Sequence, residues 1–400
     1  MSPDSATQAS TDAPAASGRP APLLPLWTDG RKQEAYAQAW TRLQVADAPV
    51  RSEALLLLSM EAEERDDFPA AVARAAEAAA AEPRFIHARL RHASTLRRTG
   101  RWQEALALAE QAAKAWPRQT VARVELAQCL MEGGRFAESQ QQYLAAIRLT
   151  PDHAAAHMGL AEALLMAEDW MAGWREYTWR TQMPAVAKDQ PKLPMPLWNG
   201  MRLPKQRLIL IADQGYGDCI QFCRFIPRAA ERVGEIVLAA SAKLSALLGR
   251  FAGVAACVDR WEKLPPATAY ARLSDLPLLL GGEEKDVGAG RRYMPLQQER
   301  LERWQARLRR DAGDRLAVGL SWSGRTGHLH NRLRSMPLAA LAPLAGLEGA
   351  CFFSLQFDEQ KAQLASWPAG GAAAIDLSGE LEGFDETAHA IAGLDLVITI

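Results

Sequence analysis

The sequence repeats itself with a period of about 34 residues over much of its first half. Prolines, large aromatic residues and small residues each recur at a position of their own within this period. The recurring residues are Pro49, Pro83, Pro117 and Pro151; Phe68, Trp102, Phe136 and Trp170; Ala71, Ala105, Ser139 and Gly173; and Ala78, Ala112 and Ala146. Such self-similarity constrains the fold more than composition does, because repeated units bury a continuous core only by stacking the same contacts on one another.

A period of this length is typical of the tetratricopeptide-repeat (TPR) unit, a helix–turn–helix. The small residues let two helices approach closely, the aromatics fill the gap between them, and each proline is expected to end a second helix. Gly100, Gly133 and Gly134 fall where the turn within a unit belongs. We therefore predict an all-α TPR solenoid over residues 25–182. Its parts are a degenerate first repeat whose second helix spans 34–46, fuller repeats at 52–84, 86–118 and 120–152, and a final repeat at 153–181.

Stacked repeats form a concave groove that takes an extended peptide or a helix. The residues expected to face this groove are rich in Ala, Arg and Glu and do not identify the ligand. The repeats therefore predict a protein or peptide partner. An array that serves only in dimerisation, or as a cap on its neighbouring domain, is the alternative.

Residues 1–24 are rich in Ser, Ala, Pro, Asp and Thr and are predicted to be a disordered leader. They do not have the pattern of a signal peptide, and no apolar run reaches the ~18 residues of a membrane span. The formal charge of −1 gives no reason to expect nucleic acid. The five cysteines show no CxxC spacing and are expected to be reduced thiols: Cys129, Cys219, Cys223, Cys257 and Cys351. We expect a cytoplasmic protein.

The second half alternates short apolar runs with helical stretches, beyond a proline-rich linker predicted at 183–204. Trp174, Tyr177, Trp179 and Arg180 precede it and are expected to attach the last helix to the next domain. Alternation of this kind indicates parallel sheets covered on both faces. We predict Rossmann-like α/β lobes at 205–296 and 313–400, joined by a helix at 297–312. The expected strands are 207–212, 235–239, 254–258, 316–321, 351–355 and 394–400, and helices are expected at 218–233 and 241–250 and from about 337, 358 and 385.

The turn DQGYGD, residues 213–218, leaves the first of these strands and enters a helix. Its glycines allow a ligand to approach the backbone closely. Asp218 is a candidate catalytic carboxylate, although an aspartate at this place could also serve only as a helix cap. The residues predicted to form a loop around it are Gln214, Gly215, Gly217 and Gln221.

A second polar loop follows the strand at 316–321 and contains hydroxyls, a glycine and several cations. This mixture suits a diphosphate, although a solvated basic loop is the alternative. His328 and His330 have no carboxylate or cysteine to complete a metal site, so we expect no metal. The predicted ligand-binding residues are Ser321, Ser323, Gly324, Arg332, Arg334, Ser335 and Gln356.

The stretch LILIADQGYGDCIQFCRFIP resembles the opening of heptosyltransferase-like glycosyltransferases (glycosyltransferase family 9), which have an apolar strand, a short turn, Gly-Asp and a helix ending in Pro. Residues from about 50 to 400 resemble bacterial proteins in which TPR repeats precede such a domain. The matching pieces, in order, are AGWREYTWR, PLW, DQGYGDCIQFCRFIP, VGLSWSG, NRLRSMPLAAL, FFSLQ and LDLVITI. This resemblance implies a GT-B fold, with an acceptor lobe from Arg207 and a nucleotide-sugar lobe from Arg315.

The resemblance also implies an inverting glycosyltransferase in which Asp218 is the general base. Ser321, Ser323, Arg332 and Arg334 would support the leaving diphosphate, with no metal and no cofactor besides the nucleotide-sugar donor. The expected acceptor is a protein held by the repeats, such as flagellin or another surface protein. The alternatives are a lipopolysaccharide heptosyltransferase-like enzyme and a non-catalytic TPR scaffold with a degenerate transferase domain.

This sequence departs from the family at its end. The family continues past LDLVITI with an Asp-Thr pair and a nearby His, whereas the sequence here stops at Ile400. We therefore expect the nucleotide-sugar lobe to be truncated. We also expect the 400-residue form to be weakly active or inactive.

Overall fold

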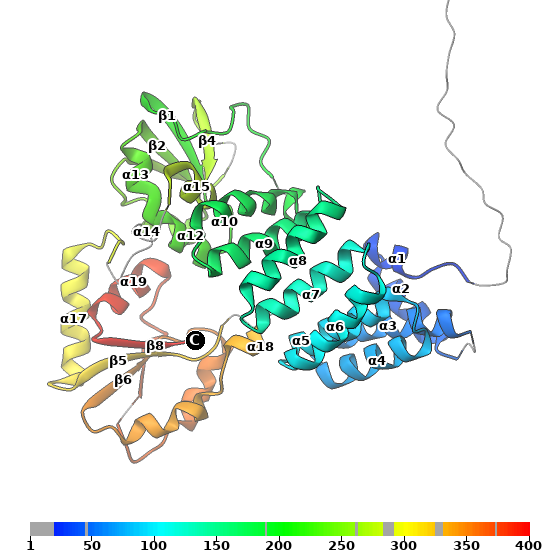
Figure 1. Ribbon diagram of the computed structural model, residues 1–400. Helices are drawn as coiled ribbons and strands as arrows, with labels where there is room; N and C mark the ends of the chain where they lie inside the picture. Colours follow the sequence, from blue (N-terminus) through cyan, green and yellow to red (C-terminus); the bar gives the residue numbers. More distant parts are fainter. Residues whose placement is uncertain are drawn as a thin grey trace, which may run out of the picture. The chain divides into compact units, whose positions relative to one another are not determined.

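Helix pairs make up the N-terminal part of the chain, as the repeat period predicts (Figure 1). The pairs are α3 (Ala48–Glu64) with α4 (Phe68–Ala81), α5 (Ile86–Arg98) with α6 (Trp102–Ala115), α7 (Thr120–Glu132) with α8 (Phe136–Leu149), and α9 (Ala154–Met166) with α10 (Trp170–Tyr177), preceded by α1 (Leu24–Thr28) and α2 (Lys32–Arg42). The computed structural model describes residues 20–44, 47–188, 190–260, 263–282, 292–324, 331–372 and 374–400. The predicted leader at 1–24 lies mostly outside these residues, but its end is ordered, because Leu23 is fully buried and Leu24 begins α1.

Each repeating residue class has a fixed place in these pairs. The four aromatics are the first residues of α4, α6, α8 and α10, and the small residues Ala71, Ala105 and Ser139 are fully buried. Three of the prolines follow the ends of second helices, as predicted. Pro49 instead lies in the first turn of α3, where a missing N–H costs nothing. The expectation that Pro49 stops the preceding helix is therefore wrong.

The turn between paired helices uses the same backbone conformation four times. Asp66, Gly100, Gly134 and Glu168 follow one another at the repeat period, and their φ angles are 60°, 82°, 69° and 62°. Glycine adopts this left-handed conformation at little cost, whereas aspartate and glutamate pay a steric penalty. The turn is thus set by the packing of the helix pair, even where the residue does not favour it.

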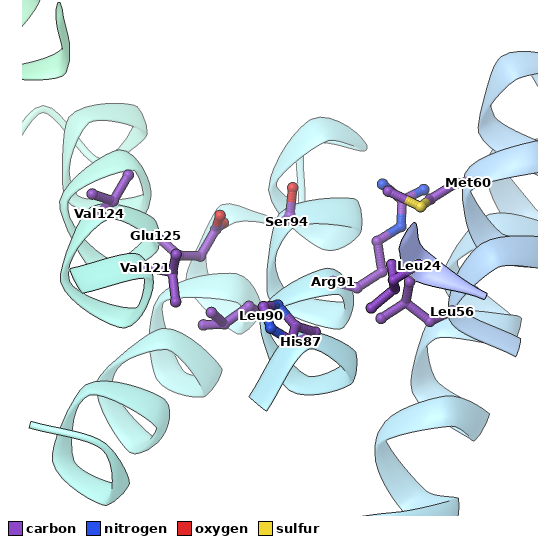
Figure 2. A pocket seen from close by; sticks show the side chains of 10 residues that line it. All are labelled: Leu24, Leu56, Met60, His87, Leu90, Arg91, Ser94, Val121, Val124 and Glu125. Carbon is purple, nitrogen blue, oxygen red and sulfur yellow. The ribbon is translucent and has the colours of Figure 1, made fainter. Parts of the chain in front are cut away.

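The first helices of three pairs line a hollow of about 340 Å³, to which α1 also contributes (Figure 2). Its side chains come from α3, α5 and α7, so they recur at equivalent positions of successive repeats. Leu56, Leu90 and Val124 are one such set, each one repeat period from the next. The predicted groove of the array therefore has a defined lining.

The rest of the chain contains two parallel four-stranded sheets with the same strand order. The first runs β3-β2-β1-β4 and the second β7-β6-β5-β8, and every pairing is parallel. The strands are β1 (Leu203–Ile211), β2 (Val233–Ala239), β3 (Val254–Val258), β4 (Ala269–Arg272), β5 (Leu316–Ser321), β6 (Ala350–Ser354), β7 (Ala374–Asp376) and β8 (Leu396–Thr399). The predicted α/β class is confirmed, and the six expected strands form, but β4 and β7 were not predicted.

The helices around the sheets are shorter than the sequence indicates. The predicted helix at 218–233 is α12 (Tyr216–Phe222), a 3₁₀ turn and α13 (Ile226–Ala230), and the helices expected near 337 and 358 are 3₁₀ segments. Pro343 lies inside the first of these segments and removes a backbone donor that an α-helix needs. These two 3₁₀ segments are η5 (Leu338–Gly346) and η6 (Glu359–Ser366). The remaining described helices after α10 are η1 (Thr178–Gln182), α11 (Pro184–Ala187), α14 (Ala242–Leu248), η4 (Leu273–Asp275), α15 (Leu276–Leu280), α17 (Gln298–Ala312), α18 (Asn331–Arg334) and α19 (Phe384–Gly393).

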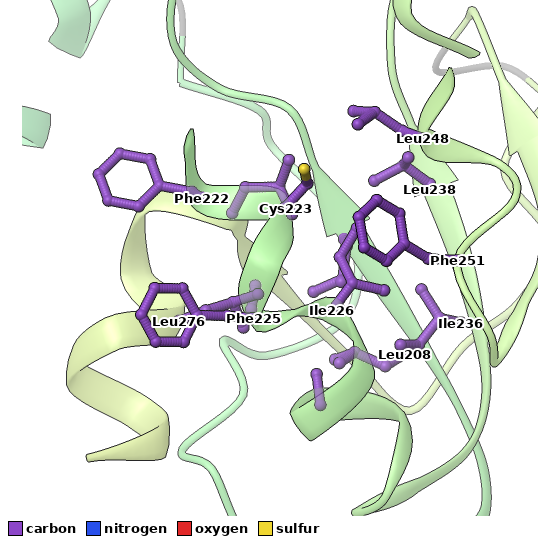
Figure 3. Close-up of a cluster of buried hydrophobic side chains, with 14 of the residues drawn as sticks. Leu208, Phe222, Cys223, Phe225, Ile226, Ile236, Leu238, Leu248, Phe251 and Leu276 are labelled. Atoms are coloured by element: carbon purple, nitrogen blue, oxygen red, sulfur yellow. The ribbon is translucent and has the colours of Figure 1, made fainter. Parts of the chain in front are cut away.

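The first sheet packs against α12 and α13 through a large apolar core (Figure 3). Phe222, Phe225 and Ile226 from these helices meet Leu208 and Ile236 from the strands. This core holds the end of β1 and the start of α12 in place, which is where the DQGYGD turn lies.

The last repeat helix belongs to the same core. The rings of Trp174 on α10 and Phe222 on α12 meet edge to face, with centroids 5.9 Å apart. The chain accordingly divides into compact units at Met1–Gly159 and Leu160–Ile400, inside α9. The predicted attachment of the last helix by its aromatic cluster is thus confirmed. The predicted linker is partly bound as well, because Trp198 is buried and its N–H donates to the Tyr270 carbonyl at 2.7 Å.

Candidate functional site

The hollow in the array has an apolar floor (Figure 2). Six of its ten lining side chains are apolar: Leu24, Leu56, Met60, Leu90, Val121 and Val124. The other four are His87, Arg91, Ser94 and Glu125. Pockets that bind ligands commonly combine such an apolar lining with a few polar groups that set orientation. We refer to these ten residues as the groove.

The charged residues of the groove are already paired within the array. Arg91 on α5 contacts Glu63 on α3 at 2.5 Å, and its Nε donates to the Ser59 hydroxyl at 2.9 Å. Glu125 on α7 accepts from Arg97 on α5 at 3.2 Å. Burial lowers the pKa of Arg91 and raises the pKa of Glu125, and the opposite charge beside each counters that effect. These pairs join neighbouring first helices and leave little net charge for a ligand.

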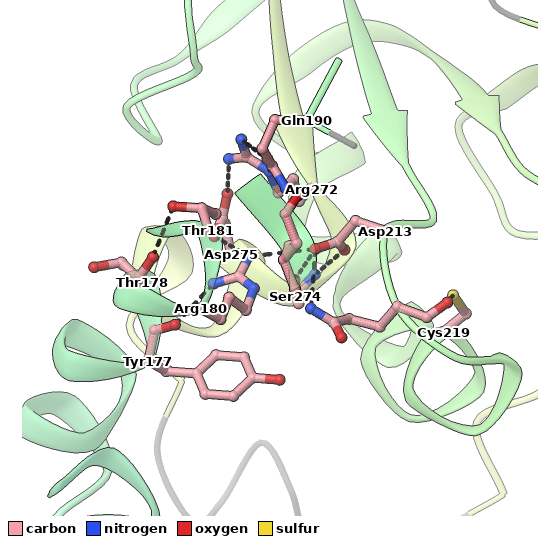
Figure 4. Close-up of polar contacts among 12 residues, drawn as sticks. Tyr177, Thr178, Arg180, Thr181, Gln190, Asp213, Cys219, Arg272, Ser274 and Asp275 are labelled. Atoms are coloured by element: carbon pink, nitrogen blue, oxygen red, sulfur yellow. Dashed lines mark hydrogen bonds and ion pairs between the residues drawn. The ribbon is translucent and has the colours of Figure 1, made fainter. Parts of the chain in front are cut away.

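The loops that follow β1 and β4 are tied together at the carboxyl end of the first sheet (Figure 4). Asp213, the second residue after β1, accepts from the Ser274 hydroxyl at 2.5 Å and from the Ser274 N–H at 3.3 Å. Because the chain leaves β1 for β2 on one side and reaches β4 on the other, this is the topological switch point of the sheet. Ligands of open α/β sheets bind at such points.

A buried arginine from outside the sheet enters this point. Arg180 in η1 is 3% exposed, lies 3.4 Å from Asp213 and donates to Asp275 in the loop after β4. Arg272 also binds Asp275, at 3.2 Å. The Arg180 guanidinium lies 4.9 Å from the centre of the Tyr177 ring. Figure 4 shows these side chains converging from three segments of the chain.

The predicted loop residues surround the start of α12. Gly215 is the N-cap, and Asp218 lies in the first turn of the helix, so Asp218 is not the helix cap that the sequence left open. Asp218 is half-buried, and a Cβ on Gly215 would come 3.2 Å from its Oδ2. The Gln214 amide lies 3.5 Å from Asp213, whereas Gly217 and Gln221 are exposed. The role of Asp218 as a base stays a prediction.

Five predicted residues of the second lobe do come together at the carboxyl end of β5. The Gln356 carbonyl accepts from the backbone N–H groups of Trp322 and Ser323, both at 3.2 Å, and lies 3.5 Å from the Ser321 hydroxyl. The Gly324 N–H donates to the Ser335 hydroxyl at 3.1 Å. Backbone donors that could face an anion are therefore bound within the loop.

Only some of the cationic side chains of this loop are among the described residues. A Cβ on Gly324 would come 2.8 Å from a guanidinium nitrogen of Arg334, so this arginine lies over the glycine. Arg334 is exposed, which leaves its charge accessible. Arg325, His328 and His330 lie outside the described residues, as does the side chain of Arg332.

The described residues hold neither a metal cluster nor a membrane-spanning helix. In that part of the chain, no three His, Cys, Asp or Glu side chains are placed to hold a metal ion. No helix within it is long and apolar enough to cross a membrane.

Asp213, Ser274, Asp275 and Arg180 were not predicted as site residues. The sequence contained a signal for Asp213, because this residue opens the polar turn after a predicted strand. Ser274 and Asp275 had none, because they follow a short strand that the sequence does not reveal. For Arg180 the sequence predicts only a place in the aromatic cluster that attaches the last helix to the next domain.

Comparison with known proteins defines the class of the N-terminal region. Two sequence families described as tetratricopeptide repeat match residues 56–120 and 96–163. Protein FlbA from Caulobacter vibrioides is 24% identical in an alignment 258 residues long, and the match covers 56% of this chain and 41% of FlbA. The chain thus spans about two fifths of the length of this curated relative.

Solved structures match the array at low overall similarity. The solved chain of MamA from Desulfovibrio magneticus RS-1, which runs from residue 41 to the end, is 16% identical with a TM-score of 0.32, and the match covers 42% of this chain and 93% of that one. TTC0263 from Thermus thermophilus, titled a thermophilic TPR protein, is 17% identical with a TM-score of 0.37, and the match covers 42% of this chain and 90% of that one. The repeat families and the helix pairs together establish a TPR protein-interaction array at the N-terminus.

Proposed function

We propose that the groove holds an extended segment of a protein, and that the α/β lobes transfer a sugar from a nucleotide-sugar to a hydroxyl of that protein. The observation that carries the proposal is the pair of parallel sheets with one strand order, each with a polar, glycine-containing loop at the carboxyl end of an inner strand. Two lobes of this kind suit a reaction between two substrates, because each lobe offers its own switch point to one of them.

The chemistry assigned to the first lobe is proton removal. As the acceptor hydroxyl oxygen bonds to the anomeric carbon, its proton passes to the Asp218 carboxylate. Asp218 is half-buried beside Gly215, whose missing side chain leaves room for a substrate to approach it. The bond between the anomeric carbon and the diphosphate oxygen breaks in the same step, and the nucleoside diphosphate leaves with the electron pair. One displacement of this kind inverts the anomeric centre.

The second lobe is assigned the leaving diphosphate. Because the backbone donors of Trp322, Ser323 and Gly324 are bound within the loop, side-chain donors are left to bind the anion. Arg334 is exposed and lies over Gly324, which suits a charge-assisted contact with a phosphate oxygen. No metal is needed in this scheme.

The groove favours a particular kind of protein segment. Its floor is apolar, and its charges are matched by Glu63 and Arg97 from within the array. A segment with apolar side chains therefore gains more than an acidic tail, which would need an unpaired cation. We propose an extended, apolar segment of a surface protein, and flagellin is the first to test.

The test compares cells that lack the gene with cells that carry the intact gene, encoding its full-length product, as the wild type, Asp218→Asn or the control Glu231→Gln. Glu231 is an exposed carboxylate of the same lobe. Intact masses of flagellin and other surface proteins are measured. We expect the mass of one sugar or more to be added with the wild type and the control, and to be lost with Asp218→Asn because the base is gone. Full modification with Asp218→Asn would reject the base assignment.

The same measurement separates the alternatives. A mass change in lipopolysaccharide without one in any protein would favour the heptosyltransferase-like interpretation. No change in either would favour a non-catalytic scaffold. For the groove, Val121→Arg adds a charge to the floor and should lower acceptor modification, whereas Leu144→Arg, on α8 outside the groove, should not. The two residues are 36% and 44% exposed, so both variants should fold.

A further inference from the structure

We propose that Arg180 is a positioning residue, which acts through Asp213 to hold the turn that carries Asp218. The inference rests on the proposed function in one respect, the role of Asp218 as the base. Arg180 lies in η1, directly after the last repeat helix α10, whereas the turn belongs to the first sheet. A positioning role for Arg180 would make the end of the array a structural part of the proposed acceptor site.

The contacts of Arg180 place it at the switch point and hold it there. Its side chain is 4% exposed, and those of Asp213 and Asp275 are 10% and 13% exposed. A cation so deeply buried is stable only beside carboxylates, and these two carboxylates come from the loops after β1 and β4. Arg180 thus bridges the two loops that form the switch point of the sheet.

Short contacts lead from Asp213 to Asp218. The Gln214 side-chain amide lies 3.5 Å from Asp213, and the Cys219 thiol donates to the Gln214 carbonyl at 3.5 Å. The Cys219 N–H donates to the Gly215 carbonyl at 3.0 Å and so closes the first turn of α12. Asp218 lies inside this closed turn. A shift of Asp213 must therefore move the turn or break these bonds.

Arg180 could instead only fasten α10 to the lobe, and the contacts give a way to tell these roles apart. Both cysteines belong to the core of the first lobe, but the thiol of Cys219, which is 2% exposed, donates to the Gln214 carbonyl of the turn, whereas Cys223 is fully buried one helical turn later. Cys219 therefore reports on the turn and Cys223 on the opening of the core. Loosening confined to the turn changes the ratio of their reactivities, and loosening of the whole lobe does not.

The experiment labels the folded full chain with iodoacetamide and follows both cysteines by mass spectrometry. The two lie in one tryptic peptide, and fragment ions separate them. The variants are Arg180→Ala, Arg180→Lys and Ser274→Ala, with Arg175→Ala as the control, because Arg175 is exposed on α10. Far-UV circular dichroism verifies the fold of each one.

We expect Arg180→Ala to raise the labelling rate of Cys219 relative to Cys223 roughly tenfold, because Asp213 loses its buried cation. Arg180→Lys keeps the charge but not the forked geometry, and should restore part of the protection. Ser274→Ala removes one hydrogen bond to Asp213, causes little risk of unfolding, and should raise the ratio less. A ratio equal to that of the control in both Arg180→Ala and Ser274→Ala would overturn the proposal.

The failure of this inference can be told from the failure of the proposed function, because labelling needs no substrate. If the ratio rises but wild-type cells show no added sugar, the positioning role stands and the transferase does not. If sugar transfer occurs and the ratio is unchanged, the transferase stands and Arg180 only fastens the helix.

Discussion

At the scale of single residues, one repeat position takes four different side chains. Leu57, Arg91, Glu125 and Gly159 occupy this position on the first helices of successive repeats. Leu57 is fully buried, while Arg91 and Glu125 line the groove and bind partners on neighbouring helices. The same repeat position therefore serves the core in one repeat and the groove in the next two.

Gly159 shows why such a position can demand one residue. A Cβ there would lie 2.1 Å from the ring of Tyr143, which is 1% exposed and cannot move aside freely. We expect Gly159→Ala to lower the free energy of unfolding by about 1–3 kcal/mol, although alanine is the better helix former. Urea unfolding followed by circular dichroism measures this. Gly349→Ala is the control, with nothing within 4 Å of the added Cβ, and an equal effect of the two variants would contradict the packing argument.

At the scale of elements, the turns between helix pairs keep their conformation when their residue changes. Two of them hold glycine, and two hold Asp66 and Glu168 at positive φ. The two acidic residues remain because the helix pair on either side determines the turn.

Replacing Glu168 by glycine should therefore stabilise the chain. The left-handed conformation costs a residue with a Cβ roughly 1–2 kcal/mol, part of which Glu168→Gly recovers. Asp66→Gly should stabilise the chain less than Glu168→Gly does, because aspartate tolerates this conformation better than glutamate. The thermal midpoint is the measurement. Gln141→Gly, at an exposed position in the interior of α8, should lower that midpoint instead, and a drop with Glu168→Gly would show that the turn is not strained.

At the scale of the whole molecule, the apolar clusters follow the division into two units. The clusters around Leu57, Ala109 and Ala122 lie within Met1–Gly159, and those around Leu208 and Phe353 lie within Leu160–Ile400. A cluster confined to one unit gives that unit its own cooperative unfolding.

Scanning calorimetry should accordingly resolve two thermal transitions. Arg97→Ala leaves the buried Glu125 without its cation and should lower only the transition of the array. Ser274→Ala should lower only the transition of the α/β unit. A single transition that both substitutions shift would show that the units unfold together.

Much of the fold follows from local patterns that the sequence displays. The repeat period specifies the helix pairs, because each pair repeats contacts between residues close in the chain. Six strands were predictable for a similar reason, since each is an apolar run bounded by polar turns. The residues of both candidate loops were predictable as well, because they come directly after such strands. Strands β4 and β7 were not, being only four and three residues long.

The sequence by itself therefore determined the TPR array, the α/β class and the polar loops after β1 and β5. Only the tertiary structure decided how these parts use their charges. Arg180 and Asp213 are 33 residues apart, and Arg180 and Asp275 are 95 apart, with no periodic relation between them. Such pairs form because packing buries the charges together, and a buried charge must find its counter-charge wherever the fold brings one. For this same reason the charges of the groove are matched within the array, and Arg180 is bound to Asp213 and Asp275 at the switch point.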